Sequence, residues 1–407
     1  MKMLSRSVAA ILLVSAGVTA APVLAQKTEA PKAPKLSKPV QAALAAAQAL
    51  QTAGDHPGAL VKIAEAEAFP TPSMDDRYMT AAVKLNTGIT TKNNPLIEEA
   101  LTKMLATDRV SATDRPKFIR TVGSLALERK DYNTATKSFE QLIALNPNDA
   151  DALIALGELY YAQKVNSKSL ESIGKAIAVN KAAGTPVPEA WYRRSLGIAY
   201  DGKVAGAVLP AATALVRAYP NPVNWRDAVL ITRDSYPKTD QQTELDMLRL
   251  QAATGSLTGE RDFVEYADAA LGRGLPGEAQ YAINEGIAKK MVTPSKPIVA
   301  ELLTSAKGKI AADKASLPGL ERDSKANPKL AMGTADAYYG YGEFAKAAAL
   351  YRTAVGGAGV DADTANLRLG ASLARAGDKA GAAEALKLVK GGMRSELAQY
   401  WLIFVGA

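Results

Sequence analysis

The sequence predicts an all-α protein built as a solenoid of antiparallel helix pairs. The first observation is a repeat: a shift of 34 residues places Gly123 on Gly157 and Phe139 on Ile173. Periods of this length, with two helices in each unit, are typical of solenoids. The second observation is that short Gly, Pro, Asn and Asp turns separate apolar helical segments from residue 40 onward. No run alternates β-branched residues as a strand would.

The first two expected pairs are marked by their turns. Residues 40–53 form an Ala-rich helix, and the turn at 54–58 (Gly-Asp-His-Pro-Gly) returns the chain into a helix over 59–68. Pro70 and Pro72 then stop helix continuation. A second pair is expected over 75–85 and 95–105, separated by Lys-Asn-Asn-Pro.

The next pairs give the clearest repeat. Helices are expected over 115–130 and 131–146, then over 150–163 and 167–179. Extra turn residues at 181–188 delay the next unit, in which Leu196-Gly197 repeats Leu156-Gly157 at a distance of 40 residues. A weaker helix over 210–219 ends at Pro220 and Pro222.

The C-terminal half is less regular until residue 331. Helices are expected there over 227–234, 243–253, 261–271 and 275–289, with one long or broken helix over 294–315. Two clean pairs follow, over 331–341 with 343–354 and 365–376 with 379–389. The apolar segment 395–405 is expected to cover the open end of the stack. We therefore predict three regions: an array over 40–232, an irregular middle over 233–330, and C-terminal pairs with a capping helix over 331–407.

The N-terminal residues predict export. Residues 1–25 combine a basic start, an apolar run and Val23-Leu24-Ala25 before Gln26, which is the pattern of a secretory signal peptide. An uncleaved anchor is the alternative, but Ser15, Gly17 and Thr19 interrupt the run. Residues 26–39 contain four Lys and three Pro and are expected to be a flexible linker. We expect a bacterial protein of the periplasm, or a secreted one, with no stable membrane insertion after cleavage.

Charge and residue types narrow the function classes. The net charge is +8, but residues 1–25 contribute +2 and residues 26–38 contribute +3, which leaves +3 for the rest. So small an excess gives no basic stripe for nucleic acid. The chain has no cysteine and one histidine, His56. Thiolate zinc sites, Cys nucleophiles, two-His metal sites and an ordinary catalytic triad are therefore not expected in one subunit. We predict no metal, no cofactor and no enzymatic activity.

The repeats resemble tetratricopeptide repeats. That family places Leu-Gly and an aromatic residue in the first helix of each unit, and small and aromatic residues in the second. The matching positions are Leu156, Gly157, Tyr160, Ile173 and Ala176; Gly123, Ala135, Phe139 and Pro147; Ala347, Tyr351 and Ala354; and Leu369, Gly370 and Ala382. The resemblance implies a right-handed superhelix whose first helices line a concave groove.

Carried over position by position, the resemblance implies a ligand-binding groove formed by twelve residues. They are Lys117, Arg120, Ser124, Asp151, Ile154, Glu158, Tyr161, Trp191, Arg194, Met332, Asp336 and Tyr339. Aromatic and Arg side chains on such a surface are binding anchors. The alternative is that Tyr161 and Trp191 pack against neighbouring helices. Of the five positions where related proteins clamp a C-terminal carboxylate, only Arg120 has a suitable side chain, so that mode is not expected.

Three short motifs have simpler interpretations than catalysis. Gly340-Tyr341-Gly342 follows an expected helix rather than the strand that a dinucleotide fingerprint needs. Ser172 and Lys175 have the Ser-x-x-Lys spacing of penicillin-binding enzymes but lie in a repeat helix without the partner motifs. Asp361 is better placed to cap the following helix than to bind a cation.

Three functions are compatible with these observations. The first is a non-catalytic scaffold that binds a protein or peptide in its groove, with self-association as a second mode. The alternative is an accessory or enzymatic factor of cell-wall metabolism, as in transglycosylases with a helical solenoid. A small-molecule-binding solenoid is a third option. The bound molecule is not identified by the sequence.

Overall fold

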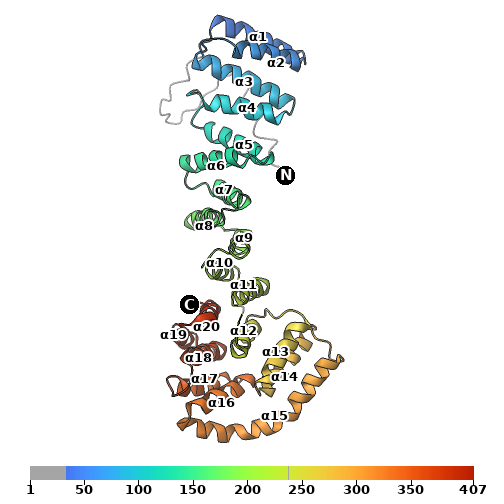
Figure 1. The fold of residues 1–407 in the computed structure, drawn as a ribbon, viewed down its shortest axis with the longest axis vertical. Helices are drawn as coiled ribbons and strands as arrows, with labels where there is room; N and C mark the ends of the chain where they lie inside the picture. Colours follow the sequence, from blue (N-terminus) through green and yellow to red (C-terminus); the bar gives the residue numbers. More distant parts are fainter. Residues whose placement is uncertain (1–33, 237) are drawn as a thin grey trace, which may run out of the picture. The chain divides into compact units, whose positions relative to one another are not determined.

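The structure is a computed structural model that describes residues 34–236 and 238–407 (Figure 1). This described part holds twenty α-helices and one short 3-10 helix, without a strand. The all-α prediction is therefore confirmed. The chain divides into two compact units, Met1–Phe118 and Ile119–Ala407. The predicted signal peptide and residues 26–33 of the predicted linker lie outside the described residues, and the three predicted regions stay a prediction.

The first unit contains two helix pairs and the beginning of α5. Its helices are α1 (Lys38–Thr52), α2 (His56–Glu67), α3 (Met74–Thr90) and α4 (Asn94–Leu105). Three of them have a Pro in the first turn, where its missing N–H removes no helical hydrogen bond. The fourth, α3, starts with a capping box in which Ser73 and Asp76 satisfy each other's backbone N–H.

A charge network joins three helices of the first unit. Lys84 is buried, with its Nζ 3.0 Å from Glu67 and 2.5 Å from Glu99. Lys103 contacts the same two carboxylates. Although burial opposes its charge, hydrogen bonds to Glu67 and Glu99 raise the pKa of Lys103. These carboxylates therefore tie α2, α3 and α4 together.

The second unit contains the remaining helices. They are α5 (Arg115–Glu128), which begins in the first unit, α6 (Tyr132–Leu145), α7 (Ala150–Ala162), α8 (Asn166–Ala182), α9 (Glu189–Asp201), α10 (Val208–Ala218), α11 (Pro222–Asp234), α12 (Gln241–Ala253), α13 (Glu260–Gly272), α14 (Pro276–Ala288), α15 (Pro297–Asp323), η1 (Ser324–Ala326), α16 (Pro328–Gly340), α17 (Phe344–Ala354), α18 (Ala362–Ala376), α19 (Lys379–Leu386) and α20 (Gly392–Val405). The closest pairs are α7 with α8, α13 with α14, α16 with α17, α17 with α18, and α18 with α19.

One glycine per matched repeat lets the two helices of a pair approach closely. A Cβ on Gly157 would lie 2.7 Å from Cγ1 of Ile173, and the same relation links Gly123 with Phe139 and Gly370 with Leu386. In each case the two residues are 16 positions apart. The glycines of the repeat motif therefore have a packing role, because any larger side chain would push the second helix away.

The turn inside each pair contains a left-handed residue. In four pairs this residue is a lysine, and Lys130 and Lys164 have φ angles of 64° and 62°. Glycines take the equivalent place at Gly54, Gly342 and Gly377. A left-handed lysine is strained where glycine is not. The turn geometry is thus repeated even where the residue type is not.

Helix α15 is longer than the sequence predicts. A helix was expected over 294–315, but α15 runs for 27 residues and contains Pro318. Val299, Leu302, Ala306 and Leu317 keep one face of it buried. Its partners on that side are α13, α14 and α16. A proline removes one backbone donor, and the continuous buried face offsets this loss.

The last helix does more than cover an end of the stack. Helix α20 contacts α18 and α19 and also α10, α11 and α12 (Figure 1). The hydroxyls of Tyr400 and Thr232 are 2.7 Å apart, and the rings of Tyr400 and Trp225 meet edge to face at 6.0 Å. The expectation that residues 395–405 cover the open end of the stack therefore describes only part of what this helix does. Within the second unit, α20 closes the chain back onto helices about 170 residues upstream.

Within residues 34–236 and 238–407, none of the helices combines the length and the apolar character needed to cross a bilayer.

Candidate functional site

The predicted residues on α7 and α9 form one half-exposed surface. We call it the α7–α9 face and define it as Ile154, Glu158, Tyr161, Trp191 and Arg194. All five side chains are half-buried. They lie on the first helices of two consecutive pairs, as the repeat pattern predicts.

Glu158, Tyr161 and Arg194 are in direct contact. The guanidinium of Arg194 donates hydrogen bonds of 2.7 and 2.6 Å to the two carboxylate oxygens of Glu158. Its carbon lies 4.0 Å from the centroid of the Tyr161 ring. The hydrogen bonds to Glu158 raise the pKa of Arg194. This geometry places the guanidinium of Arg194 over the ring of Tyr161, with part of both side chains still open to solvent.

Tyr161 and Trp191 are each packed in part against neighbouring groups and exposed in part. Trp191 packs in part against the main core of the second unit, and its carbonyl accepts a hydrogen bond of 3.0 Å from the Ser195 hydroxyl. Tyr161 is covered in part by Arg194. Neither ring is fully buried. Their role in binding stays a prediction.

The other predicted residues of α5 and α7 are mostly engaged in pairs or exposed. Arg120 forms an ion pair with Asp149, the residue that caps α7. Ser124 is half-buried and Asp151 is exposed. Lys117, in the first unit, forms an ion pair of 2.9 Å with Asp114. Ion pairs therefore engage the charged groups of both Lys117 and Arg120.

The predicted C-terminal groove residues lie in a different environment. Asp336 and Tyr339 are buried, with 6% and 5% of their surface exposed. Met332 is half-buried against the core. The expectation that Asp336 and Tyr339 line an open groove is wrong in this conformation. Arg249 of α12 donates to Asp336 and lies 4.5 Å from the Tyr339 ring centroid, and Arg368 of α18 and Tyr351 of α17 also donate to Asp336.

Five charged side chains meet at this place. We call Asp246, Arg249, Glu278, Asp336 and Arg368 the buried ionic cluster. Arg249 donates to Glu278 at 2.7 Å and to Asp336 at 3.0 Å. Arg368 donates to Asp246 at 2.8 Å and to Asp336 at 2.9 Å. The cluster thus joins α12, α14, α16 and α18.

The cluster favours the ionised form of Asp336. Burial alone would raise the pKa of Asp336, but Arg368 and Arg249 outweigh this effect and hold it below its usual value. The hydroxyls of Tyr351 and Tyr266 donate further hydrogen bonds, of 2.6 Å to Asp336 and 2.7 Å to Glu278. Buried charges need such partners, because an unpaired one would carry its full desolvation cost.

Sequence reasoning missed the cluster, although α12 contains a signal for it. Its residues 245–252 read Leu-Asp-Met-Leu-Arg-Leu-Gln-Ala, an apolar run interrupted by Asp246 and Arg249. A charged residue in such a run is often paired when it is buried. The identity of the partners, up to 122 residues away, is not visible in local patterns.

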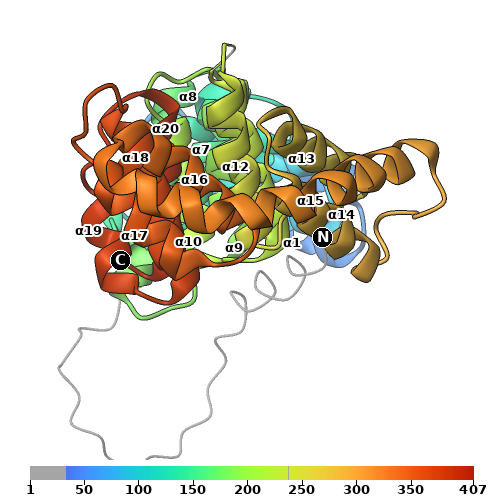
Figure 2. The same ribbon diagram turned by 90° about the horizontal axis from the view of Figure 1, so that it is seen from below.

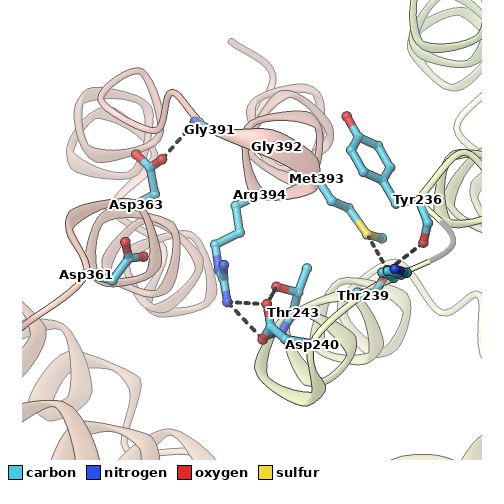
Figure 3. A pocket seen from close by; sticks show the side chains of 11 residues that line it. Tyr236, Thr239, Asp240, Thr243, Asp361, Asp363, Gly391, Gly392, Met393 and Arg394 are labelled. Carbon is cyan, nitrogen blue, oxygen red and sulfur yellow. Dashed lines mark hydrogen bonds and ion pairs between the residues drawn. The ribbon is translucent and has the colours of Figure 1, made fainter.

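A cavity of about 340 Å³ opens at the N-terminal end of α12 (Figure 3). Its walls come from the starts of α12, α18 and α20. They are formed by Tyr236, Lys238, Thr239, Asp240, Thr243, Asp361, Asp363, Gly391, Gly392, Met393 and Arg394. Arg394 reaches across it from α20 to Asp240, with contacts of 3.1 and 3.2 Å. Asp363 accepts a hydrogen bond of 2.7 Å from the Gly391 N–H on the other side.

The three short motifs have structural roles. Asp361 caps α18 by accepting a hydrogen bond from the Thr364 N–H, as the sequence predicts. The Ser172 hydroxyl donates to the Leu153 carbonyl at 2.8 Å, and Lys175 pairs with Glu171. Gly340 ends α16. In the described parts of the chain, no three His, Cys, Asp or Glu side chains are grouped so that they could hold a metal ion.

Comparison with known proteins identifies two repeat segments. Residues 123–164 match the family model described as "TPR repeat", and residues 332–392 match the one described as "Tetratricopeptide repeat". No curated protein matches the chain.

Several solved structures are similar to parts of the chain. One is the MamA protein, with 20% identity over 50% of this chain and 98% of that one, and a TM-score of 0.29. Another is PilF of Pseudomonas aeruginosa, with 14% identity over 47% and 96%, and a TM-score of 0.25. A third is a tetratricopeptide repeat protein from Parabacteroides merdae, with 14% identity over 67% and 100%, and a TM-score of 0.28.

The first matched segment contains the Gly157 contact with Ile173, and the second contains the Gly370 contact with Leu386. Both contacts are made by a glycine of the predicted repeat motif. The chain therefore contains tetratricopeptide repeats within residues 123–164 and 332–392.

Proposed function

We propose that this protein is a non-catalytic scaffold of the bacterial periplasm that binds a protein or peptide partner on the α7–α9 face. The coarse part of this proposal follows from the family, since tetratricopeptide repeats generally mediate protein–protein interactions. The proposed location is supported by the signal-peptide pattern of residues 1–25.

The observation that carries the choice of surface is the stacked group of Tyr161, Arg194 and Glu158 beside Trp191. Binding hot spots are enriched in Tyr, Trp and Arg. Here the arginine is held in place by 2.7 and 2.6 Å hydrogen bonds before any partner arrives. Less side-chain entropy is then lost on binding, which favours affinity. The expected partner segment offers apolar groups to the two rings and polar groups to the ion pair.

Site-specific photocrosslinking in the full chain tests the surface. A photoreactive residue replaces Tyr161 or Trp191, and a matched control carries it at Lys175, which is exposed on α8. We expect a discrete crosslinked protein from the bacterial envelope at the first two positions and none at the control. Equal crosslinking at all three positions would show that the surface is not selective.

Two further measurements test the remaining parts of the proposal. Cell fractionation of the full chain with a C-terminal tag should recover the shortened protein outside the cytoplasm. A peptidoglycan-hydrolysis assay on the purified protein should give no activity above background. Clear hydrolysis would favour the cell-wall alternative instead.

A further inference from the structure

Helix α1 has one exposed face that consists mainly of alanine. In the first unit, α1 and α2 form the outermost pair (Figure 1). The residues that bury the other side of α1 in the core of this unit are Val40, Leu44 and Ala47. On the opposite side lie Ala42, Ala45 and Ala49, all of which are exposed. This side of the helix therefore presents small apolar side chains to solvent.

A groove of about 390 Å³ lies between α1 and α2 beside this face. We call it the α1–α2 groove. It is lined by Pro39, Val40, Ala42, Ala43, Ala46, Lys62, Glu65 and Phe69. Six of these eight residues are apolar, and the ring of Phe69 is only half-buried. Helix α3 packs against both α1 and α2 from the side of their buried residues. The α1–α2 groove is therefore a second surface of the same pair that a helix fits.

The exposed side of α1 is also free of charge. In the sequence, no charged residue occurs between Lys38 and Asp55. An outermost repeat usually has a polar outer face, which keeps the array soluble. Contact between two copies across a two-fold axis places identical residues near each other. Charged side chains at such a place would repel their own copies, whereas alanine and glutamine do not. The composition of α1 therefore suits contact with a second α1 in particular.

The two charged residues of the α1–α2 groove are complementary to their own copies. Lys62 and Glu65 are 2.7 Å apart in one chain, and their side chains are 38% and 51% exposed. Each copy thus brings one cation and one carboxylate to the groove. A two-fold axis that brings Lys62 of one copy to Glu65 of the other also brings the reverse pair together. A single face therefore supplies both halves of a charge-matched contact.

We propose that the α1–α2 groove and the alanine face of α1 form a dimer interface, whose occupant is the same surface of a second copy of this chain. The two α1 helices meet across a two-fold axis, and alanine lets them approach closely. Lys62 and Glu65 pair between copies at the rim. A dimer presents two α7–α9 faces, so a partner with two matching segments gains avidity. Dimer formation is measured without any partner, so the inference does not rest on the proposed function.

The contact closes as a dimer instead of extending into a filament. A filament needs a different surface of the second copy to fill the groove, whereas the same surface on both copies gives a closed pair. The helices at the end of the second unit are already covered, because α20 packs on α18 and α19 and contacts α10, α11 and α12. Figure 2 shows α12, α18 and α20 beside one another. We therefore expect association to stop at two chains.

Analytical ultracentrifugation of the full chain tests the dimer. We expect the average mass to rise with protein concentration from one chain to two. Ala46→Glu places two like charges in the apolar groove and should weaken association by about a hundredfold or more. The matched control is Ala300→Glu, at an exposed alanine of α15, and it should dimerise as the unaltered protein does. A monomer at every concentration, or a dimer that Ala46→Glu leaves unchanged, overturns the inference.

A mixing experiment tests the charged rim. Lys62→Glu and Glu65→Lys each remove both pairs between copies, and each should weaken dimer formation by about tenfold. An equimolar mixture of the two variants should recover it, because every carboxylate of one variant then faces a lysine of the other. An effect within one chain cannot be recovered by mixing. Circular dichroism establishes that both variants are folded, and a mixture that associates no better than its components contradicts the proposed contact.

Cysteine crosslinking identifies what fills the groove, since the chain has no cysteine of its own. Single cysteines replace Ala42, Ala46 or Ala49, and mild oxidation should give a covalent dimer from at least one of them. Lys175→Cys on α8 is the control and should stay monomeric. A monomer whose Ala46→Cys thiol is shielded from a thiol reagent would assign the groove to another segment of the same chain. A crosslink to a different protein would assign it to a foreign partner, and either result overturns the inference.

Discussion

Arg194 donates two hydrogen bonds to Glu158, which lies 36 residues earlier on the preceding first helix. The two side chains are 35% and 43% exposed. Exposed pairs of this kind contribute at most about 1 kcal/mol to stability, because water competes for both partners. The pair is therefore better suited to organise a surface than to stabilise the fold.

We expect a double-mutant cycle with Arg194→Ala and Glu158→Ala to give a coupling energy below about 1 kcal/mol in urea unfolding. The affinity for the crosslinked partner should fall by more in Arg194→Ala than the stability does, because the Tyr161 ring loses the side chain that holds it in place. A variant that loses stability and binding in proportion would argue against a direct contact with the partner.

Asp336, in contrast to this exposed pair, should contribute strongly to the stability of the fold. It is buried between Arg249 and Arg368, with contacts of 3.0 and 2.9 Å. Asp336→Ala removes one partner from each arginine and should cost about 3–5 kcal/mol of unfolding free energy. The exposed Asp151→Ala is the matched control and should change stability by less than about 0.5 kcal/mol. Urea unfolding of the full chain measures both, and a cost near that of the control would contradict the assigned role.

The same residue predicts a pH dependence. The arginines hold the folded-state pKa of Asp336 below its usual value. The unfolded state therefore takes up a proton first as the pH falls below about 4, and stability decreases through this window. At higher pH the contribution is fully present. In Asp336→Asn the slope of unfolding free energy against pH between about 4 and 3 should be smaller by up to about 1.4 kcal/mol per pH unit. An unchanged slope would mean that other carboxylates account for it.

A left-handed lysine predicts a stabilising change. Lys164 has a φ of 62° in the turn between α7 and α8. Lys164→Gly should relieve this strain and raise the unfolding free energy by about 1 kcal/mol, after subtraction of the extra unfolded-state entropy of glycine. Lys137, exposed in the interior of α6, provides the control. There the same change should cost about 1 kcal/mol. Thermal unfolding of both variants should therefore shift in opposite directions.

The sequence predicts the helices well because their signals are local. The predicted helix boundaries are wrong where one residue type can either end a helix or begin one. Pro222 was read as the end of a helix, but Asn221 caps α11 and Pro222 occupies its first turn. The predicted start at 227 was therefore five residues late. In the same way, the helix expected over 331–341 begins at Pro328, after the cap Asn327.

The candidate sites depend on contacts that no local pattern contains. The repeat resemblance placed Asp336 and Tyr339 on the inner side of α16, and that is where Arg249 meets them. What it could not supply is Arg249 itself, which comes from α12. The partner of Asp246 is Arg368, 122 residues later on α18, a helix that contacts α12 directly. Tyr161 and Glu158 could be predicted because their partner, Arg194, lies on α9, which is the first helix of the next repeat.

Two glycines in consecutive first helices give the sharpest test of the repeat motif. Both follow a Leu, yet a Cβ on Gly157 would lie 2.7 Å from Ile173, whereas one on Gly197 would meet nothing within 4 Å. Gly197→Ala should therefore raise the unfolding free energy by about 1 kcal/mol through helix propensity alone. Gly157→Ala gains the same propensity but forces α8 away from α7. Overpacking costs about 1–3 kcal/mol, so its net effect should be neutral to destabilising by about 2 kcal/mol. Ile173→Val in the same chain should recover part of the loss. If both alanine variants are equally stabilised in urea unfolding, close approach of the paired helices is not the reason for glycine in this motif.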